Sequence, residues 1–144
     1  MHLGLIQQGL KRVTDIEIST LPFCGALFRG ACDKNVIDLA VTALGDGKVL
    51  SYVLTLNTHL PVIHTKIPDE LSSICDKDGI PVDPCMHIVA LENVISNIVT
   101  KTSKLKKAPL VVIMGDHSPP FYKTSNRDVF LKEQVLGYVL KPKT

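Results

Sequence analysis

One apolar run that ends abruptly in polar residues limits the folds that this chain can adopt. Residues 110–114 read Leu-Val-Val-Ile-Met, and Gly115, Asp116 and His117 follow directly. In parallel α/β sheets the strands are apolar on both faces, and ligands collect at their carboxyl ends. The run therefore predicts a buried strand that places Asp116 and His117 at the edge of a sheet where ligands bind.

These two residues offer a carboxylate oxygen and an imidazole nitrogen side by side. Both groups are good ligands for Zn²⁺ or Mn²⁺, and Gly115 permits a tight turn that presents them. A Gly-Asp-His sequence after a strand also forms Asx-type turns in which the histidine is simply hydrogen-bonded. The motif alone leaves both interpretations open.

Length and composition bound the class of protein. A chain of 144 residues is the size of one domain with a real core, so we predict a single domain over residues 1–144. The formal net charge of +2 is too small to indicate a nucleic-acid partner. No window approaches the roughly 20 apolar residues that span a bilayer, and the first residues lack the order of a signal peptide.

Four cysteines lie in two close pairs, Cys24 with Cys32 and Cys75 with Cys85. Each pair encloses a loop rich in Gly, Pro or Asp, the kind of loop that disulfides close. Neither pair has C-x-x-C spacing, and no histidine follows at the spacing of a zinc finger. Two local disulfides are the preferred interpretation, and reduced, buried thiols are the alternative. Bridged cysteines would place the domain outside the cytoplasm.

Helical and extended patterns alternate along the chain. Helices are predicted at residues 3–13, 33–44 and 87–102, and strands at 49–56, 110–114 and 134–140. Asp33 is placed to cap the second helix. The segment from Pro61 to Pro84 has no periodicity and is predicted to be a long excursion. The alternation predicts an α/β fold, a mostly parallel sheet flanked by helices.

The strand predicted at 49–56 also ends in a polar motif, Asn57-Thr-His59-Leu-Pro61. Since the carboxyl ends of parallel strands share one edge, we expect His59 to lie near Asp116 and His117. Three such side chains would bind a metal ion or an anion together. A strand-end histidine bonded only to a carbonyl is the alternative for His59.

With these motifs the chain resembles the sulfatase-like branch of the alkaline phosphatase superfamily. It is similar above all to the membrane-anchored enzymes that make lipoteichoic acid or transfer phosphoethanolamine to lipid A. Residues 55–61 look like the family's strand that ends in (Asn or Ser)-x-His-x-Pro, and residues 111–117 look like its late strand with an Asp-His pair. The two cysteine pairs are placed as in the phosphoethanolamine transferases. The resemblance covers most of the chain.

The resemblance implies a partial alkaline-phosphatase-like domain with a divalent metal, Zn²⁺ or Mn²⁺, on Asp116 and His117, and with His59 on the transferred phosphate group. The implied reaction moves phosphoethanolamine or phosphoglycerol from a phospholipid to a cell-envelope glycan or lipid, or hydrolyses the ester, through a covalent enzyme intermediate. The implied location is the periplasmic or extracellular face of a membrane, with an anchor outside this chain.

The chain departs from the family pattern in two places. The family's nucleophile, and the early strand with a further acidic ligand, have no counterpart here, so the match is to the C-terminal portion of the catalytic domain. Ser118-Pro-Pro-Phe121 stands where the transferases have Gly-Glu, and no histidine follows His117. Because two ligands hold zinc weakly, the chain alone is expected to bind metal poorly and to be inactive.

Two further expectations follow from the same sequence. Strands that lack their neighbours leave apolar edges open, which predicts self-association of the chain. A different class of protein also fits, namely an autonomous, non-catalytic binding domain derived from the same fold. An Asp116 paired with a lysine would favour that second interpretation.

Overall fold

The computed structural model describes residues 20–25, 30–44, 50–62, 67, 69–131 and 134–142. Its elements in chain order are β1 (Phe23–Cys24), β2 (Gly30–Ala31), α2 (Asp33–Ala43), α3 (Asp69–Lys77), α4 (Val82–Thr102), β3 (Val111–Met114), α5 (Thr124–Arg127) and β4 (Gly137–Leu140). The fold is mixed α/β, with helices and two small antiparallel sheets. The helix predicted at 3–13 lies outside the described residues.

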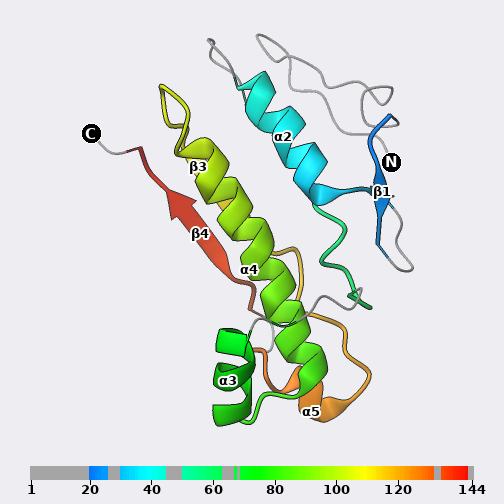
Figure 1. Cartoon of the computed structure of the whole chain (residues 1–144). Helices are drawn as coiled ribbons and strands as arrows, with labels where there is room; N and C mark the ends of the chain where they lie inside the picture. The colour runs from blue at the N-terminus through cyan, green and yellow to red at the C-terminus, as the bar shows by residue number, and fades with distance from the viewer. Residues whose placement is uncertain are drawn as a thin grey trace.

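Helix α4 is the central element, and α2, α3 and α5 all contact it (Figure 1). Ile37 of α2 and Val89 of α4 are buried in the core, and an ion pair between Asp38 and Lys101 joins the same two helices. The helix predicted at 87–102 is confirmed, but it begins earlier, at Val82. Pro84 lies in the first turn, where its missing N–H has no helical partner to lose, so proline does not delay the start.

Strands β3 and β4 confirm that strands form around residues 110 and 137, although their pairing is antiparallel. The predicted burial of the first strand is wrong, because Val112 and Met114 are 60 and 72% exposed. Val112 pairs with Val139, and Met114 with Gly137. No parallel pair occurs among the strands of the described residues. A parallel pair needs a crossover that carries the chain back along the strand. Among its described residues, the connection between β3 and β4 contains only the four-residue helix α5.

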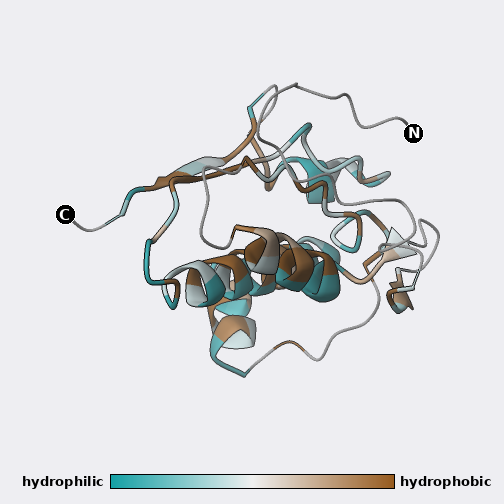
Figure 2. Ribbon diagram, turned by 90° about the horizontal axis from the view of Figure 1, so that it is seen from above, coloured by the Kyte–Doolittle hydropathy of each residue, from teal (hydrophilic) through white to brown (hydrophobic). Residues whose placement is uncertain are grey.

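The buried strand predicted at 49–56 is wrong for residues 50–56, which form no strand. Leu50, Tyr52 and Leu54 are 62, 72 and 48% exposed, and half-buried residues alternate with them. The segment is extended, with one face toward the protein. In Figure 2 the extended segments, brown where they are hydrophobic, lie mostly on one side of the long helices.

The segment from Pro61 to Pro84 contains helix α3, so the expectation that it has no periodic structure is wrong. The sequence pattern that indicates this helix is short. Leu71, Ile74 and Cys75 have the helical spacing i, i+3, i+4. The acids Asp69 and Glu70 are favourable in the first turn, and Lys77 is favourable in the last. A disulfide between Cys75 and Cys85 fastens α3 to α4.

Both predicted disulfides are present, Cys24 with Cys32 and Cys75 with Cys85, and no free cysteine remains. Two bridges indicate an oxidising location, extracellular or periplasmic. Among the described residues, no helix has the length and apolar character needed to cross a membrane.

An aromatic cluster around His87 fills the end of the core where α4 meets α5. His87 is 6% exposed, and its ring meets Phe121 and Phe130 edge-on, with centroids 5.9 Å away in each case. Phe121 and Phe130 stack on each other at 5.8 Å. The Nδ1 atom of His87 is buried and has no hydrogen-bond partner among the residues that the structure describes. Burial, and then the charge of His59, lower the pKa of His87 to about 4, so the ring is neutral at physiological pH.

We expect acid to destabilise the fold through His87. Because its pKa in the folded state lies below the usual value, the unfolded chain binds more protons between about pH 6.5 and 4, and stability falls as pH falls through that window. The loss should be about 2 kcal/mol. Urea unfolding from pH 7 to 4.5 should show a flatter pH dependence in His87→Leu than in the wild type. An unchanged slope in His87→Leu would contradict the assignment.

Candidate functional site

The structure brings His59 and His117 together from distant parts of the sequence. Their ring centroids lie 6.4 Å apart, and the rings meet edge to face at 79°. Asp116 lies beside His117, with 3.7 Å between its Oδ2 and the His117 Nε2. All three residues that the sequence singled out therefore lie where the chain leaves β3 and where the 50–56 segment ends.

Both histidines hold the same ring nitrogen in a local hydrogen bond. His59 Nδ1 lies 2.9 Å from the Leu60 carbonyl oxygen, and His117 Nδ1 lies 2.9 Å from that of Ser118. A carbonyl oxygen can only accept, so Nδ1 carries the proton in each neutral ring. Nε2 then carries the lone pair, the atom that a metal ion requires, and such a carbonyl contact orients metal-bound histidines in general.

Asp116 forms a local turn and still points an oxygen at His117. Its Oδ1 accepts a hydrogen bond of 2.9 Å from the His117 backbone N–H, which is the turn that the sequence left open as an alternative. Its Oδ2 remains 3.7 Å from Nε2 of His117. A carboxylate oxygen and an imidazole nitrogen this close together would both be able to hold one divalent metal ion.

The pair supplies only two protein ligands. Within the described part of the chain, no group of three or more His, Cys, Asp or Glu side chains could hold a metal ion. Asp116 and His117 are also open to solvent, with side chains 77 and 55% exposed. A metal ion bound here would take its other ligands from water, from a substrate or from groups beyond the described residues.

Gly115 fits the site for a reason other than the one expected. Its φ is not in the left-handed region; a Cβ at this position would lie 3.4 Å from Cβ of Val135. Its N–H donates to the Leu136 carbonyl at 3.1 Å. The missing side chain thus lets the end of β3 lie closely against the segment that enters β4.

A buried carboxylate positions the His59 segment. Asp33, only 5% exposed, accepts hydrogen bonds from the backbone N–H groups of Leu56, at 2.9 Å, and Asn57, at 3.1 Å. Asn57 Oδ1 in return accepts from the Asp33 N–H at 2.6 Å. We call these three bonds the Asp33–Asn57 clasp. Because the His59 N–H donates to the Leu56 carbonyl at 3.1 Å, the clasp sets the place of His59 as well.

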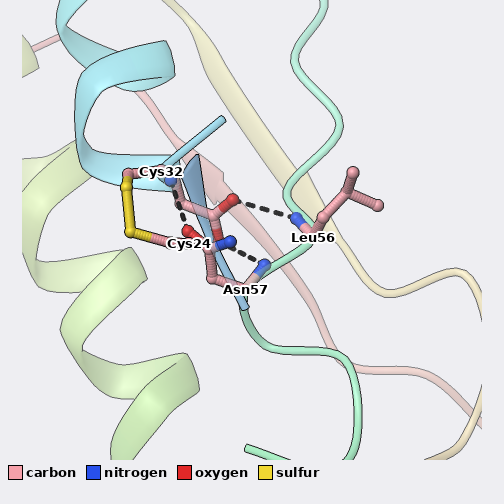
Figure 3. The surroundings of a disulfide bond; sticks show 5 residues. Cys24, Cys32, Leu56 and Asn57 are labelled. Carbon is pink, nitrogen blue, oxygen red and sulfur yellow. Dashed lines mark hydrogen bonds between the residues drawn. A yellow bond between two sulfur atoms is a disulfide. The ribbon is translucent and has the colours of Figure 1, made fainter. Parts of the chain in front are cut away.

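The predicted role of Asp33 as the cap of its own helix is wrong. Cys32 occupies the N-cap position without a side-chain bond, and Asp33 is the first helical residue. Burial raises the pKa of Asp33, and the two backbone bonds oppose that rise less strongly. The disulfide from Cys24 to Cys32 lies next to this carboxylate, with Leu56 and Asn57 beside it (Figure 3). The disulfide therefore ties the β1–β2 hairpin to the same helix end.

Comparisons with models of known protein families, with curated proteins and with solved structures gave no match. The functional proposal therefore depends on the fold, on the geometry of His59, Asp116 and His117, and on the resemblance of the two motifs.

Removing the clasp should loosen both the fold and the site. We expect Asp33→Ala to lower the free energy of unfolding by about 3 kcal/mol, since hydrogen bonds to a charged group contribute about 1.5–3 kcal/mol each. Asp38→Ala, on the same helix, breaks only the partly exposed pair with Lys101 and should cost less than about 1 kcal/mol. Urea titration measures both variants, and equal losses would contradict the role of the clasp.

Proposed function

We propose that this chain forms one side of a metal-dependent, sulfatase-like phosphotransferase site. In this proposal Asp116 and His117 are metal ligands, and His59 contacts the phosphate group that is transferred. The observation that supports it is the 6.4 Å approach of the two histidine rings, each with Nδ1 bonded to a carbonyl. The same arrangement also fits the two motifs that resemble the family.

Asp116, His117 and His59 have separate roles in this proposal. Asp116 Oδ2 and His117 Nε2 would hold the metal ion, which would supply Lewis acidity and offset charge on the phosphoryl oxygens. His59 has its Nδ1 proton committed to Leu60, so its Nε2 donates to phosphate only when the ring is protonated.

The proposed reaction is transfer of phosphoethanolamine or phosphoglycerol from a phospholipid to a cell-envelope glycan or lipid, or hydrolysis of the same ester. It would pass through a covalent enzyme intermediate, and no residue of this chain is assigned as its nucleophile. An extracellular or periplasmic location, indicated by the two disulfides, agrees with a cell-envelope substrate. Anchoring at the membrane by segments outside this chain belongs to the proposal.

A second candidate is a non-catalytic binding domain that self-associates through its extended layer. The observation in its favour is a set of exposed apolar side chains there, Tyr52, Leu54, Val112 and Met114 among them. Apolar surface of this kind marks interaction sites. The neighbour of Asp116 argues against this second candidate. A lysine partner would have favoured the binding domain, but Asp116 lies beside His117.

Binding measurements distinguish the metal-ligand role of Asp116 from the phosphate-binding role of His59. By calorimetry with Zn²⁺ or Mn²⁺, Asp116→Asn should weaken metal binding at least about tenfold, since even residues that only support metal ligands contribute 10- to 100-fold. Asp78→Asn, an exposed acid on the loop after α3, should bind as the wild type does. His59→Ala should keep metal affinity and lose the metal-dependent binding of O-phosphoethanolamine or glycerol 1-phosphate.

Two results would contradict the proposal. One is equal metal affinity in Asp116→Asn and Asp78→Asn, which would remove the ligand role. The other is ester binding that requires neither the metal ion nor His59, which would show that the two histidines do not act at one site. A self-associating chain that binds neither metal nor ester would favour the binding domain.

A further inference from the structure

A basic surface lies at the end of the β3–β4 sheet opposite the metal pair. Helix α4 ends at Thr102, and the loop that carries the chain into β3 holds three exposed lysines. A fourth exposed lysine directly follows β4. We call these four residues the basic end: Lys104, Lys106, Lys107 and Lys141. The loop and the end of β4 lie at the same end of the sheet, because Val111 at the start of β3 pairs with Leu140 (Figure 1).

Neither the helix dipole nor an ion pair accounts for these lysines. Lys101 lies in the last turn of α4, where a cation is favourable, and it pairs with Asp38. The dipole effect falls off within that turn, and the loop lysines come after it. Within the described part of the chain, no ion pair includes a residue of the basic end. The sequence also has no acid at residues 93–115 or 134–144, so neighbours along the chain do not offset these charges.

An exposed apolar face adjoins the basic end. On one face of the β3–β4 sheet, Val112 and Val139 lie opposite each other and are 60 and 58% exposed. Leu110, just before β3, is 63% exposed. Because side chains alternate along a strand, Leu110 continues the face of Val112, and Lys141 continues that of Val139. Aliphatic side chains and cations therefore form one continuous surface.

This combination fits a lipid bilayer better than it fits other partners. Proteins that lie on a bilayer place apolar side chains at the boundary between headgroups and acyl chains, and lysines beside them on anionic headgroups. A nucleic acid or an anionic glycan would pair with the lysines but offers no apolar phase to Leu110 and Val112. A second copy of the chain in a symmetric dimer would cover the aliphatic side chains, but it presents the same surface and therefore offers the lysines no anion.

We propose that the basic end and the apolar face beside it bind the surface of an anionic lipid bilayer. The lysines attract phospholipid headgroups, and Leu110, Val112 and Val139 enter the layer between headgroups and acyl chains. Each lysine near such a surface contributes about fivefold in affinity. The contact is made by the described chain itself and requires no metal ion. It therefore goes beyond the proposed function, which leaves anchoring to segments outside this chain.

The test is co-sedimentation of the full chain with lipid vesicles in EDTA, so that no metal ion joins the protein to a phosphate group. We expect binding to vesicles of equal parts phosphatidylglycerol and phosphatidylcholine, and at least about tenfold weaker binding to phosphatidylcholine alone. Raising the salt concentration from about 0.1 to about 1 M should weaken binding to the anionic vesicles, because the Debye length falls from about 10 to about 3 Å. Equal binding to both kinds of vesicle would overturn the assignment.

A triple lysine variant tests the charges. Lys104→Gln, Lys106→Gln and Lys107→Gln together should weaken binding to anionic vesicles about 100-fold, from about fivefold for each lysine. The matched control removes three exposed lysines elsewhere on the chain: Lys34→Gln, Lys77→Gln and Lys123→Gln. The control makes the same change in net charge and should bind nearly as the wild type does, because the attraction falls off within a Debye length. Equal losses in the two variants would show that net charge alone drives binding, which would also overturn the assignment.

Leu110→Ser tests the apolar part of the surface. It should weaken binding to the anionic vesicles about tenfold, the lower end of what burial of a leucine contributes. Tyr122→Ser, at a fully exposed ring between β3 and α5, should leave binding unchanged. Unchanged binding in Leu110→Ser would indicate a polyanion as the partner, and a dimer that Leu110→Ser dissociates would indicate a second copy of the chain. Either result, or no binding of the wild type to vesicles, would overturn the assignment.

Discussion

The clasp between Asp33 and Asn57 is the interaction on which the rest of the site depends. A buried carboxylate is costly unless its oxygens are hydrogen-bonded, and here both accept backbone N–H groups from the segment that leads to His59. The same residue begins α2, which packs on α4. One side chain therefore joins the helical layer to the extended layer and sets where His59 lies relative to His117.

Local patterns in the sequence predicted part of this fold. Helical periodicity located α2 and α4, apolar runs located β3 and β4, and cysteine spacing gave both disulfides. Residues 50–56 were misjudged because burial depends on what covers a segment, which a local pattern cannot show. The direction of pairing between β3 and β4 is likewise set by the path of the connecting chain.

The sequence predicted which residues form the candidate site, but not why they lie close together. A shared edge of a parallel sheet was the reason to expect His59 near His117, yet the described strands pair antiparallel. The rings meet because Asp33 holds a segment 24 residues away by hydrogen bonds. No local signal marks such a contact, since acids at helix starts usually serve their own helix.

The central claim is that His117 offers its Nε2 lone pair to a metal ion while His59 lies beside it with Nδ1 bonded to a carbonyl, and the tautomer of each ring tests it most directly. Long-range ¹H–¹⁵N spectra of the labelled chain at pH 8, without metal, report which nitrogen carries the proton. The hydrogen bonds to Leu60 and Ser118 predict the Nδ1–H form for both rings. The Nε2–H form in His117 would place an N–H group where a metal ligand requires a lone pair, and would contradict the account.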